Sequence, residues 1–215
     1  MNRCVIVGGA GIAGYDRVNR MLRENDFGVY CDSGLRHLPH LRLRPGLIVG
    51  DFDSHPRPRS GPEANVETIV LPREKDDTDT VYAVKEALRR GYDDFLLIGV
   101  AGARLDHTLG NISLLLYLDT LGKKARLLDN YSEMEIVSRE PAEIPDTFPW
   151  FSLLNVSGIA RDISITGAKY PLSGAEITCD YQYGISNEPL PGQTARVSVQ
   201  EGRLLLIKVC ASTGK

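Results

Sequence analysis

Strand-length apolar runs alternate with helical segments through about the first 129 residues, and this alternation constrains the fold more than any other feature of the sequence. The runs are short and rich in β-branched residues, as in the buried strands of a parallel sheet: residues 4–7, 28–31, 47–49, 66–71 and 95–100. The segments between them place apolar residues at helical spacing: residues 15–22, 78–90 and 107–121. We therefore expect an α/β domain of three layers, with a mostly parallel sheet between helices.

The pattern changes beyond residue 132. From Glu133 onward no long helical period appears, and short β-type runs are separated by Gly, Pro, Asn and Ser. Such spacing favours an all-β domain, and we expect a β-sandwich. The sequence thus predicts two domains, the α/β domain over residues 1–132 and the β-sandwich over residues 133–215.

A glycine-rich turn follows the first predicted strand. Gly9, Gly11 and Gly14 form a G-x-G-x-x-G pattern, and Asp32 stands at the end of the second predicted strand. Glycines in this position let the backbone approach a phosphate, and an acid after the second strand can bind a ribose. The pattern supports nucleotide binding but does not establish hydride transfer. A tight turn without a ligand is the alternative.

Acidic residues gather at the ends of several predicted strands. Asp51 and Asp53 come directly after the third run, and further acids flank the fourth and fifth runs: Asp76, Asp77, Asp79 and Asp106. Carboxylates this close to one another repel unless a cation or a shared proton relieves them. Because no set of Cys and His ligands accompanies them, the implied metal is a hard one, Mg²⁺ or Mn²⁺. Asp77 or Thr78 is expected to cap the helix over residues 78–90, but a cap would explain one acid and not the whole set.

Two basic residues stand beside these acids. Lys75 and Arg104 are candidates to offset charge on a phosphate, as cations do in phosphoryl transfer. The nucleotide turn, the acids and these cations together indicate transfer from a nucleotide polyphosphate. The sequence has neither the G-x-x-x-x-G-K-[ST] loop of P-loop enzymes nor the H-R-D motif of protein kinases, so we expect an enzyme of another class.

The composition excludes several kinds of partner. The net charge is −3 and no basic run is interleaved with aromatic residues, so we expect no nucleic acid partner. No run approaches the roughly 18 apolar residues of a membrane span, and the N-terminus lacks the apolar core of a signal peptide, so we expect no membrane partner and a cytoplasmic location. His37 is expected at the surface or as a cap rather than in catalysis. Four cysteines lie in apolar segments and are expected to be buried, without disulfides or zinc: Cys4, Cys31, Cys179 and Cys210.

Four motifs, in order along the chain, resemble those of the thiamine pyrophosphokinase (thiamin diphosphokinase) family. They are Gly50-Asp51-Phe52-Asp53-Ser54, Lys75-Asp76-Asp77-Thr78-Asp79, the stretch from Gly102 to Asn111, and Gly167 to Leu172 with Ser186-Asn187-Glu188. The resemblance implies an N-terminal catalytic domain that binds nucleotide and metal, and a C-terminal sandwich that binds thiamine and forms a homodimer with shared active sites. The implied reaction is Mg²⁺-dependent transfer of pyrophosphate from ATP to the hydroxyl of thiamine, which gives thiamine diphosphate and AMP.

The resemblance also implies roles for individual residues. The metal and the phosphates would be surrounded by Asp51, Asp53 and Asp79, and Arg104 and Asp106 would complete the catalytic set. With the glycine turn included, the residues expected to bind the nucleotide are Gly9, Asp32, Ser54, Lys75, Thr78 and Asn111. Ser186 and Asn187 would reach the thiamine ring from the sandwich of the second subunit. Three residues depart from those usual in the family and affect fine positioning rather than the type of reaction: Ser33, Ala103 and Gly110.

Three other functions are compatible with parts of the sequence. A pyrophosphokinase for another hydroxymethyl heterocycle, such as a pterin, would keep the N-terminal acids and differ where the sandwich contacts the ring. An NAD-dependent oxidoreductase would use the glycine turn and Asp32, but it leaves the acidic clusters unexplained. A non-catalytic sensor would bind nucleotide or thiamine without turnover.

Overall fold

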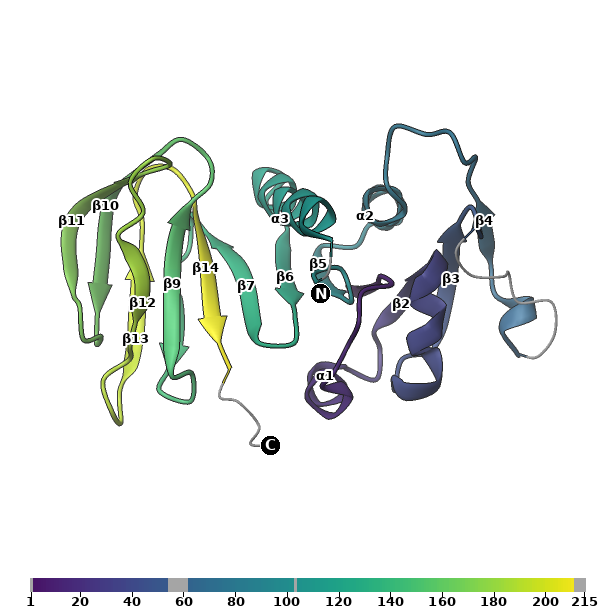
Figure 1. Ribbon diagram of the computed structural model, residues 1–215, viewed down its shortest axis with the longest axis horizontal. Coiled ribbons are helices and arrows are strands. Elements are labelled where there is room, and N and C mark those ends of the chain that lie inside the picture. The colour runs from purple at the N-terminus through teal and green to yellow at the C-terminus, as the bar shows by residue number, and fades with distance from the viewer. Residues whose placement is uncertain (1, 54–61, 103, 211–215) are drawn as a thin grey trace. The chain divides into compact units, whose positions relative to one another are not determined.

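The structure is a computed structural model that describes residues 2–53, 62–102 and 104–210 (Figure 1). The chain divides into two compact units, Met1–Asn130 and Tyr131–Lys215. This division falls two residues before the boundary expected from the sequence. Ser54, one of the predicted site residues, lies outside the described residues.

The first unit is built on a parallel sheet in the order β6-β5-β1-β2-β3-β4. Its strands are β1 Arg3–Val7, β2 Phe27–Cys31, β3 Pro45–Gly50, β4 Thr68–Val70, β5 Asp94–Ile98 and β6 Lys124–Leu128. Every residue of β1 and β5 is buried, which agrees with the nearly continuous apolar sequence of these central strands. Because the strands are parallel, their carboxyl ends meet at one edge of the sheet.

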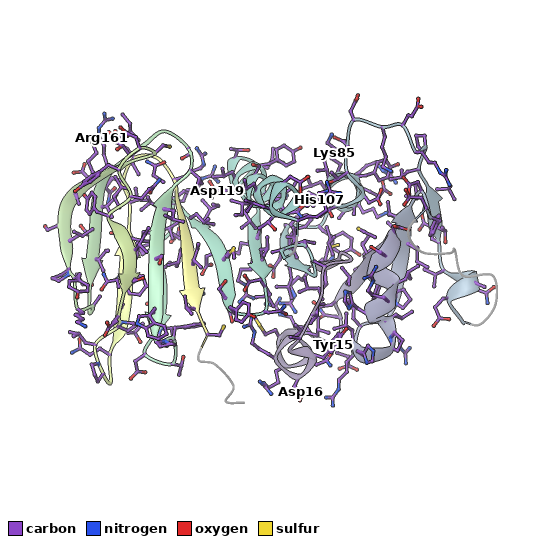
Figure 2. The ribbon with its side chains drawn as sticks, in the orientation of Figure 1. Tyr15, Asp16, Lys85, His107, Asp119 and Arg161 are labelled. Atoms are coloured by element: carbon purple, nitrogen blue, oxygen red, sulfur yellow. The ribbon has the colours of Figure 1, made fainter. Side chains whose placement is uncertain are left out.

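Helices cover both faces of this sheet (Figure 1). The helices of this unit are α1 Tyr15–Met21, η1 Asp32–His40, η2 Pro62–Asn65, α2 Asp79–Arg89 and α3 Leu105–Thr120, where η marks a 3₁₀ helix. Figure 2 shows Lys85 of α2 and His107 of α3 on the opposite side of the sheet from Tyr15 of α1. On the α1 side, Val18 of α1 and Leu35 of η1 pack into one apolar core with the strands. The three-layer α/β domain expected from the sequence is confirmed.

The second unit consists of two antiparallel sheets, in the orders β12-β9-β14-β7 and β11-β10-β13-β8. Its strands are β7 Ser132–Val137, β8 Ala142–Pro145, β9 Trp150–Asn155, β10 Ile159–Thr166, β11 Leu172–Thr178, β12 Gly184–Asn187, β13 Thr194–Ser198 and β14 Leu204–Val209. Phe151 and Leu204 of the first sheet share one buried core with Ile163 and Val197 of the second. A common core between two antiparallel sheets is the arrangement of a sandwich, so this prediction is confirmed as well.

Most element ends lie within two residues of those predicted. Helix α3 begins at Leu105 rather than at His107, and the strand expected over 66–71 is limited to Thr68–Val70. None of the helices in the described part of the chain has the length and apolar character needed to cross a bilayer.

Three expectations about single residues are wrong. His37 is only 2% exposed, because η1 turns it under the glycine-rich turn rather than toward solvent. Cys179 is exposed, because it lies beyond the end of β11, where its Sγ accepts a hydrogen bond from the backbone N–H of Gly158. Cys210, expected to be buried, is only half-buried, because it follows the last residue of β14. All four cysteines are free thiols.

Candidate functional site

Three carboxylates converge at the carboxyl edge of the parallel sheet. Asp32 follows β2, Asp51 follows β3, and Asp79 begins α2. One oxygen from each carboxylate lies within 4.8 Å of the others. Asp32 is buried, while Asp51 and Asp79 are half-buried. We call these three residues the acid triad. The sequence predicted that Asp51 and Asp79 would share a site, but it assigned Asp32 to the nucleotide instead.

Lys75 contacts two members of the acid triad. Its Nζ lies 2.7 Å from Oδ2 of Asp51 and 3.1 Å from Oδ1 of Asp79. The hydrogen bond from Lys75 lowers the pKa of the Asp51 carboxyl below its ordinary value. Burial alone would lower the pKa of the Lys75 ammonium, but its contacts with both carboxylates outweigh burial and raise it. Lys75 therefore remains charged at neutral pH.

The backbone is strained at one member of the triad, Asp32, and at Phe52, which follows another member, Asp51. Asp32 has φ 38° and Phe52 has φ 57°, values that non-glycine residues adopt rarely and at a cost of about 1–3 kcal/mol each. Phe52 packs against the apolar core on the α1 side of the sheet. Because of the left-handed conformation of Phe52, the side chains of Asp51 and Asp53 point in different directions. Asp51 belongs to the triad, while Asp53 is exposed. Among the described residues the triad does not include Asp53, contrary to the predicted grouping.

The donor set of the triad fits a hard divalent cation. It consists of carboxylate oxygens without sulfur or imidazole, which is the ligand type of Mg²⁺ and Mn²⁺. Oδ1 of Asp79 is buried and accepts no hydrogen bond, although it is in ion-pair contact with Lys75. Three carboxylates and one ammonium leave a formal charge of −2. The acid triad could therefore hold a metal ion.

Arg104 and Asp106 form an exposed ion pair at the start of α3. Nη2 of Arg104 lies 2.5 Å from Oδ2 of Asp106, and both side chains are about two-thirds exposed. The Arg104 guanidinium lowers the pKa of Asp106 to about 2. Neither residue contacts the triad among the described atoms, so the guanidinium is available to a ligand approaching this helix end.

Asn111 serves the fold in this structure. It is buried, and its Nδ2 donates a 2.7 Å hydrogen bond to the carbonyl of Val100, just beyond β5. Thr108 tightens the same turn, since its hydroxyl accepts from the N–H of Gly102 and donates to the carbonyl of Arg104. The predicted ligand Asn111 thus fixes the turn that presents Arg104.

Thr78 is the N-cap of α2. Its Oγ1 accepts a hydrogen bond of 3.3 Å from the backbone N–H of Val81. This cap fixes the first turn of α2 and with it Asp79, the first helical residue. Capping here was predicted for Asp77 or Thr78, and Asp77 instead pairs with Lys85.

The glycine-rich turn is supported by His37, which was expected at the surface or as a cap. Nε2 of His37 lies 3.0 Å from the carbonyl oxygen of Ala10, and Nδ1 lies 2.8 Å from the Tyr15 hydroxyl. Because a carbonyl only accepts, Nε2 carries the proton and Nδ1 accepts from Tyr15. Burial lowers the pKa of His37, which favours this neutral form. Gly9 packs on Ser33 so closely that a Cβ would lie 1.8 Å from the Ser33 hydroxyl oxygen.

Ser186 and Asn187 lie on β12 in the second unit and differ in what they offer a ligand. Ser186 is exposed, with φ 58°. Asn187 is buried: its Oδ1 accepts from the N–H groups of Tyr170 and Glu188, and its Nδ2 donates to the carbonyl of Tyr170. The side chain of Asn187 is therefore committed to holding the Tyr170 segment.

Comparison with known proteins places the chain in a family. Residues 18–127 match the model for the thiamin pyrophosphokinase catalytic domain, and residues 133–204 match the model for the thiamin pyrophosphokinase vitamin B1 binding domain. Thiamine pyrophosphokinase from Bacillus subtilis (strain 168) is 31% identical over 86% of this chain and 88% of its own. The crystal structure of the Bacillus subtilis enzyme superposes with a TM-score of 0.83 at 25% identity, covering 98% of this chain and 100% of that one. The structure of thiamin pyrophosphokinase from Geobacillus thermodenitrificans gives 0.83 at 27% identity, covering 98% and 99%. The chain belongs to the thiamin pyrophosphokinase family.

Proposed function

We propose that this enzyme transfers a pyrophosphoryl group from ATP to the hydroxyl of thiamine, with Mg²⁺ at the acid triad, and releases thiamine diphosphate and AMP. The observation that supports this proposal most strongly is the convergence of Asp32, Asp51 and Asp79 at the carboxyl edge of a parallel sheet in a chain of this family. In open α/β sheets, ligands bind at this edge.

The acid triad supplies the metal ligands in this proposal. A bound Mg²⁺ would draw charge from the phosphate oxygens and hold the polyphosphate in line with the attacking hydroxyl. Thr78 keeps Asp79 in place through its cap, and Asp53 acts from the exposed side of the same turn that presents Asp51. Lys75 supplies a positive charge to the phosphate oxygens.

Arg104 acts on the phosphates from the start of α3. Its exposed guanidinium carries donors that suit phosphate oxygens, and it stabilises the charge that develops as AMP departs. Asp106 orients this guanidinium. With a pKa of about 2, Asp106 is a weak base at neutral pH and is better suited to orientation than to proton abstraction.

The glycine-rich turn binds the nucleotide in this proposal. Among the described residues, nothing beyond the chain neighbours lies within 4 Å of the Cβ position at Gly11, and at Gly14 the nearest atom is the Cβ of Arg17 at 3.9 Å, so the backbone there is open to a phosphate or ribose. Gly9 and His37 fix the shape of the turn from beneath. Ser54, outside the described residues, is expected to contact the nucleotide.

The second unit binds thiamine in this proposal. The family model that covers residues 133–204 is described as a vitamin B1 binding domain. Ser186 offers an exposed hydroxyl to the ring, while Asn187 holds the neighbouring Tyr170 segment in shape. A homodimer would bring this unit to the acid triad of a second subunit, which gives two shared active sites.

Incubation of the purified chain with thiamine, ATP and Mg²⁺ tests the reaction. We expect equal amounts of thiamine diphosphate and AMP by chromatography, and neither product when EDTA replaces Mg²⁺. A parallel reaction with a hydroxymethyl pterin tests the alternative substrate class. Absence of AMP with thiamine, or faster turnover of the pterin, would contradict the proposal. Sedimentation of the protein at assay concentration tests the homodimer.

A further inference from the structure

Lys75 lies where a second cation would bind. Its Nζ makes ion-pair contacts with two of the three carboxylates that make up the acid triad, at 2.7 and 3.1 Å. The side chain is 17% exposed, so it is largely withdrawn from solvent. A divalent ion bound to the same oxygens would be brought within about 4 Å of the ammonium, where two like charges repel strongly.

We infer that Lys75 competes with the divalent cation for Asp51 and Asp79, as a tethered counter-ion that must leave these carboxylates when the metal binds. The inference rests on the proposed metal site at the acid triad. It concerns what Lys75 does to metal binding, not which reaction the site performs.

Asp51 and Asp79 are fixed by the elements they belong to, whereas Lys75 is free to move. Asp51 follows directly on β3, and Asp79 is the first residue of a helix whose N-cap is Thr78. Lys75 belongs to neither a strand nor a helix, since it lies between the end of β4 at Val70 and the start of α2. Its side chain also has more rotatable bonds than an aspartate. The lysine can therefore move while the two carboxylates stay in place.

The charge balance explains why such a counter-ion would be useful. Without Lys75, three carboxylates within 4.8 Å of one another would carry a formal charge of −3 and destabilise the folded chain. With Lys75 the charge is −2, and with a divalent cation in place of the ammonium it is −1. Metal binding thus replaces one cation by another at Asp51 and Asp79, and its affinity is reduced by the cost of breaking the existing contacts.

Metal titration of lysine variants tests the competition. Lys75→Met keeps the length of the side chain and removes its charge. Lys85→Met is the matched control, because Lys85 also pairs with an aspartate, Asp77, but lies outside the triad. In calorimetric titrations with Mn²⁺ and no nucleotide, we expect Lys75→Met to bind about tenfold more tightly than the wild type, which is about 1.4 kcal/mol. Lys85→Met should bind as the wild type does.

Unchanged or weaker Mn²⁺ binding by Lys75→Met would overturn the inference. Asp51→Asn separates this result from failure of the metal site itself. If Asp51→Asn leaves Mn²⁺ affinity unaltered, the acid triad is not the metal site and the proposed function loses its metal. If Asp51→Asn weakens binding while Lys75→Met does not strengthen it, only the competition is wrong.

A second measurement uses the wild-type protein and so does not depend on how a variant folds. Lysine acetylation by a water-soluble ester, followed by mass spectrometry, reports how freely each ammonium reacts. We expect Mn²⁺ to increase the rate at Lys75 several-fold, because the displaced ammonium loses its two carboxylate partners. The rate at Lys85 should not change. An equal or lower rate at Lys75 with Mn²⁺ would overturn the inference.

Discussion

Gly50 and Asp32 touch at the carboxyl ends of β3 and β2. A Cβ on Gly50 would lie 2.9 Å from the Cβ of Asp32, a distance that real Cβ atoms do not show. The missing side chain lets two neighbouring strand ends approach closely, and this approach places Asp32 beside Asp51. The acid triad therefore depends on a glycine that carries no functional group.

Gly50→Ala should damage the site through packing alone. The added methyl group must push the end of β3 away from Asp32, at a cost of about 1–3 kcal/mol in the free energy of unfolding. We also expect weaker Mn²⁺ binding, because the triad is widened. Gly110→Ala is the control: apart from the backbone of α3 itself, the described part of the chain places no atom within 4 Å of its Cβ position, so it should keep or slightly raise stability. Chemical unfolding and calorimetry measure both effects, and a Gly50→Ala protein as stable as the wild type would contradict the argument.

Asp51→Asn and Asp53→Asn should separate metal binding from turnover. Asp51 belongs to the triad, so its substitution should weaken Mn²⁺ binding by at least about tenfold. Asp53 is exposed, so Asp53→Asn should change the free energy of unfolding by less than about 0.5 kcal/mol and still abolish turnover. Calorimetry, unfolding and product formation distinguish the two. Marked unfolding of Asp53→Asn would show that this acid is structural.

Sequence periodicity predicted the layers of the fold but not the detailed membership of the site. The alternation of strands and helices suffices to place Asp51 and Asp79 at one edge, since parallel strands end together. Phe52 has a left-handed backbone conformation, which directs Asp53 away from the triad. The pattern of apolar and acidic residues in the sequence does not indicate this conformation. The entry of Asp32 into the triad depends on close approach at Gly50, which is a tertiary contact.

The sequence also did not show which polar side chains form hydrogen bonds with the backbone. Asn111 and Asn187 were expected to bind ligands, yet both are buried and bonded to backbone groups. A motif identifies such a residue, but it does not say whether the side-chain amide binds a ligand or a backbone group of the protein. His37, by contrast, was expected at the surface but is buried. No pattern around it indicated burial, because η1 has an irregular sequence with Pro39 inside it.

Ser186→Ala and Asn187→Ala should affect thiamine binding for different reasons. Asn187→Ala leaves the N–H and C=O of Tyr170 without their partner, which should cost about 2 kcal/mol of stability and raise the KM for thiamine. Ser186→Ala removes only an exposed hydroxyl, so it should raise this KM with little change in stability. Steady-state kinetics and thermal unfolding give both quantities. If Asn187→Ala raises the KM at unchanged stability, Asn187 contacts thiamine directly.

The buried His37 should make stability depend on pH. Its folded-state pKa is lowered, first by burial and then by the nearby Arg36 and His40, although its hydrogen bond to Ala10 opposes this. Below the ordinary pKa of about 6.5 the unfolded chain therefore binds more protons at this residue than the folded chain does. Stability contributed by neutral His37 is complete above pH 6.5 and is lost as the pH falls toward the folded-state value.

His37→Gln tests this dependence because glutamine can still donate to the carbonyl of Ala10 but does not titrate. The difference in free energy of unfolding between wild type and variant should shrink as the pH falls from 7.5 to 5, since only the wild type then loses its contribution from His37. Because His37 supports the glycine-rich turn through Ala10, the KM for ATP should rise in His37→Ala more than in His37→Gln. Equal KM values for the two variants would mean that this hydrogen bond does not position the turn.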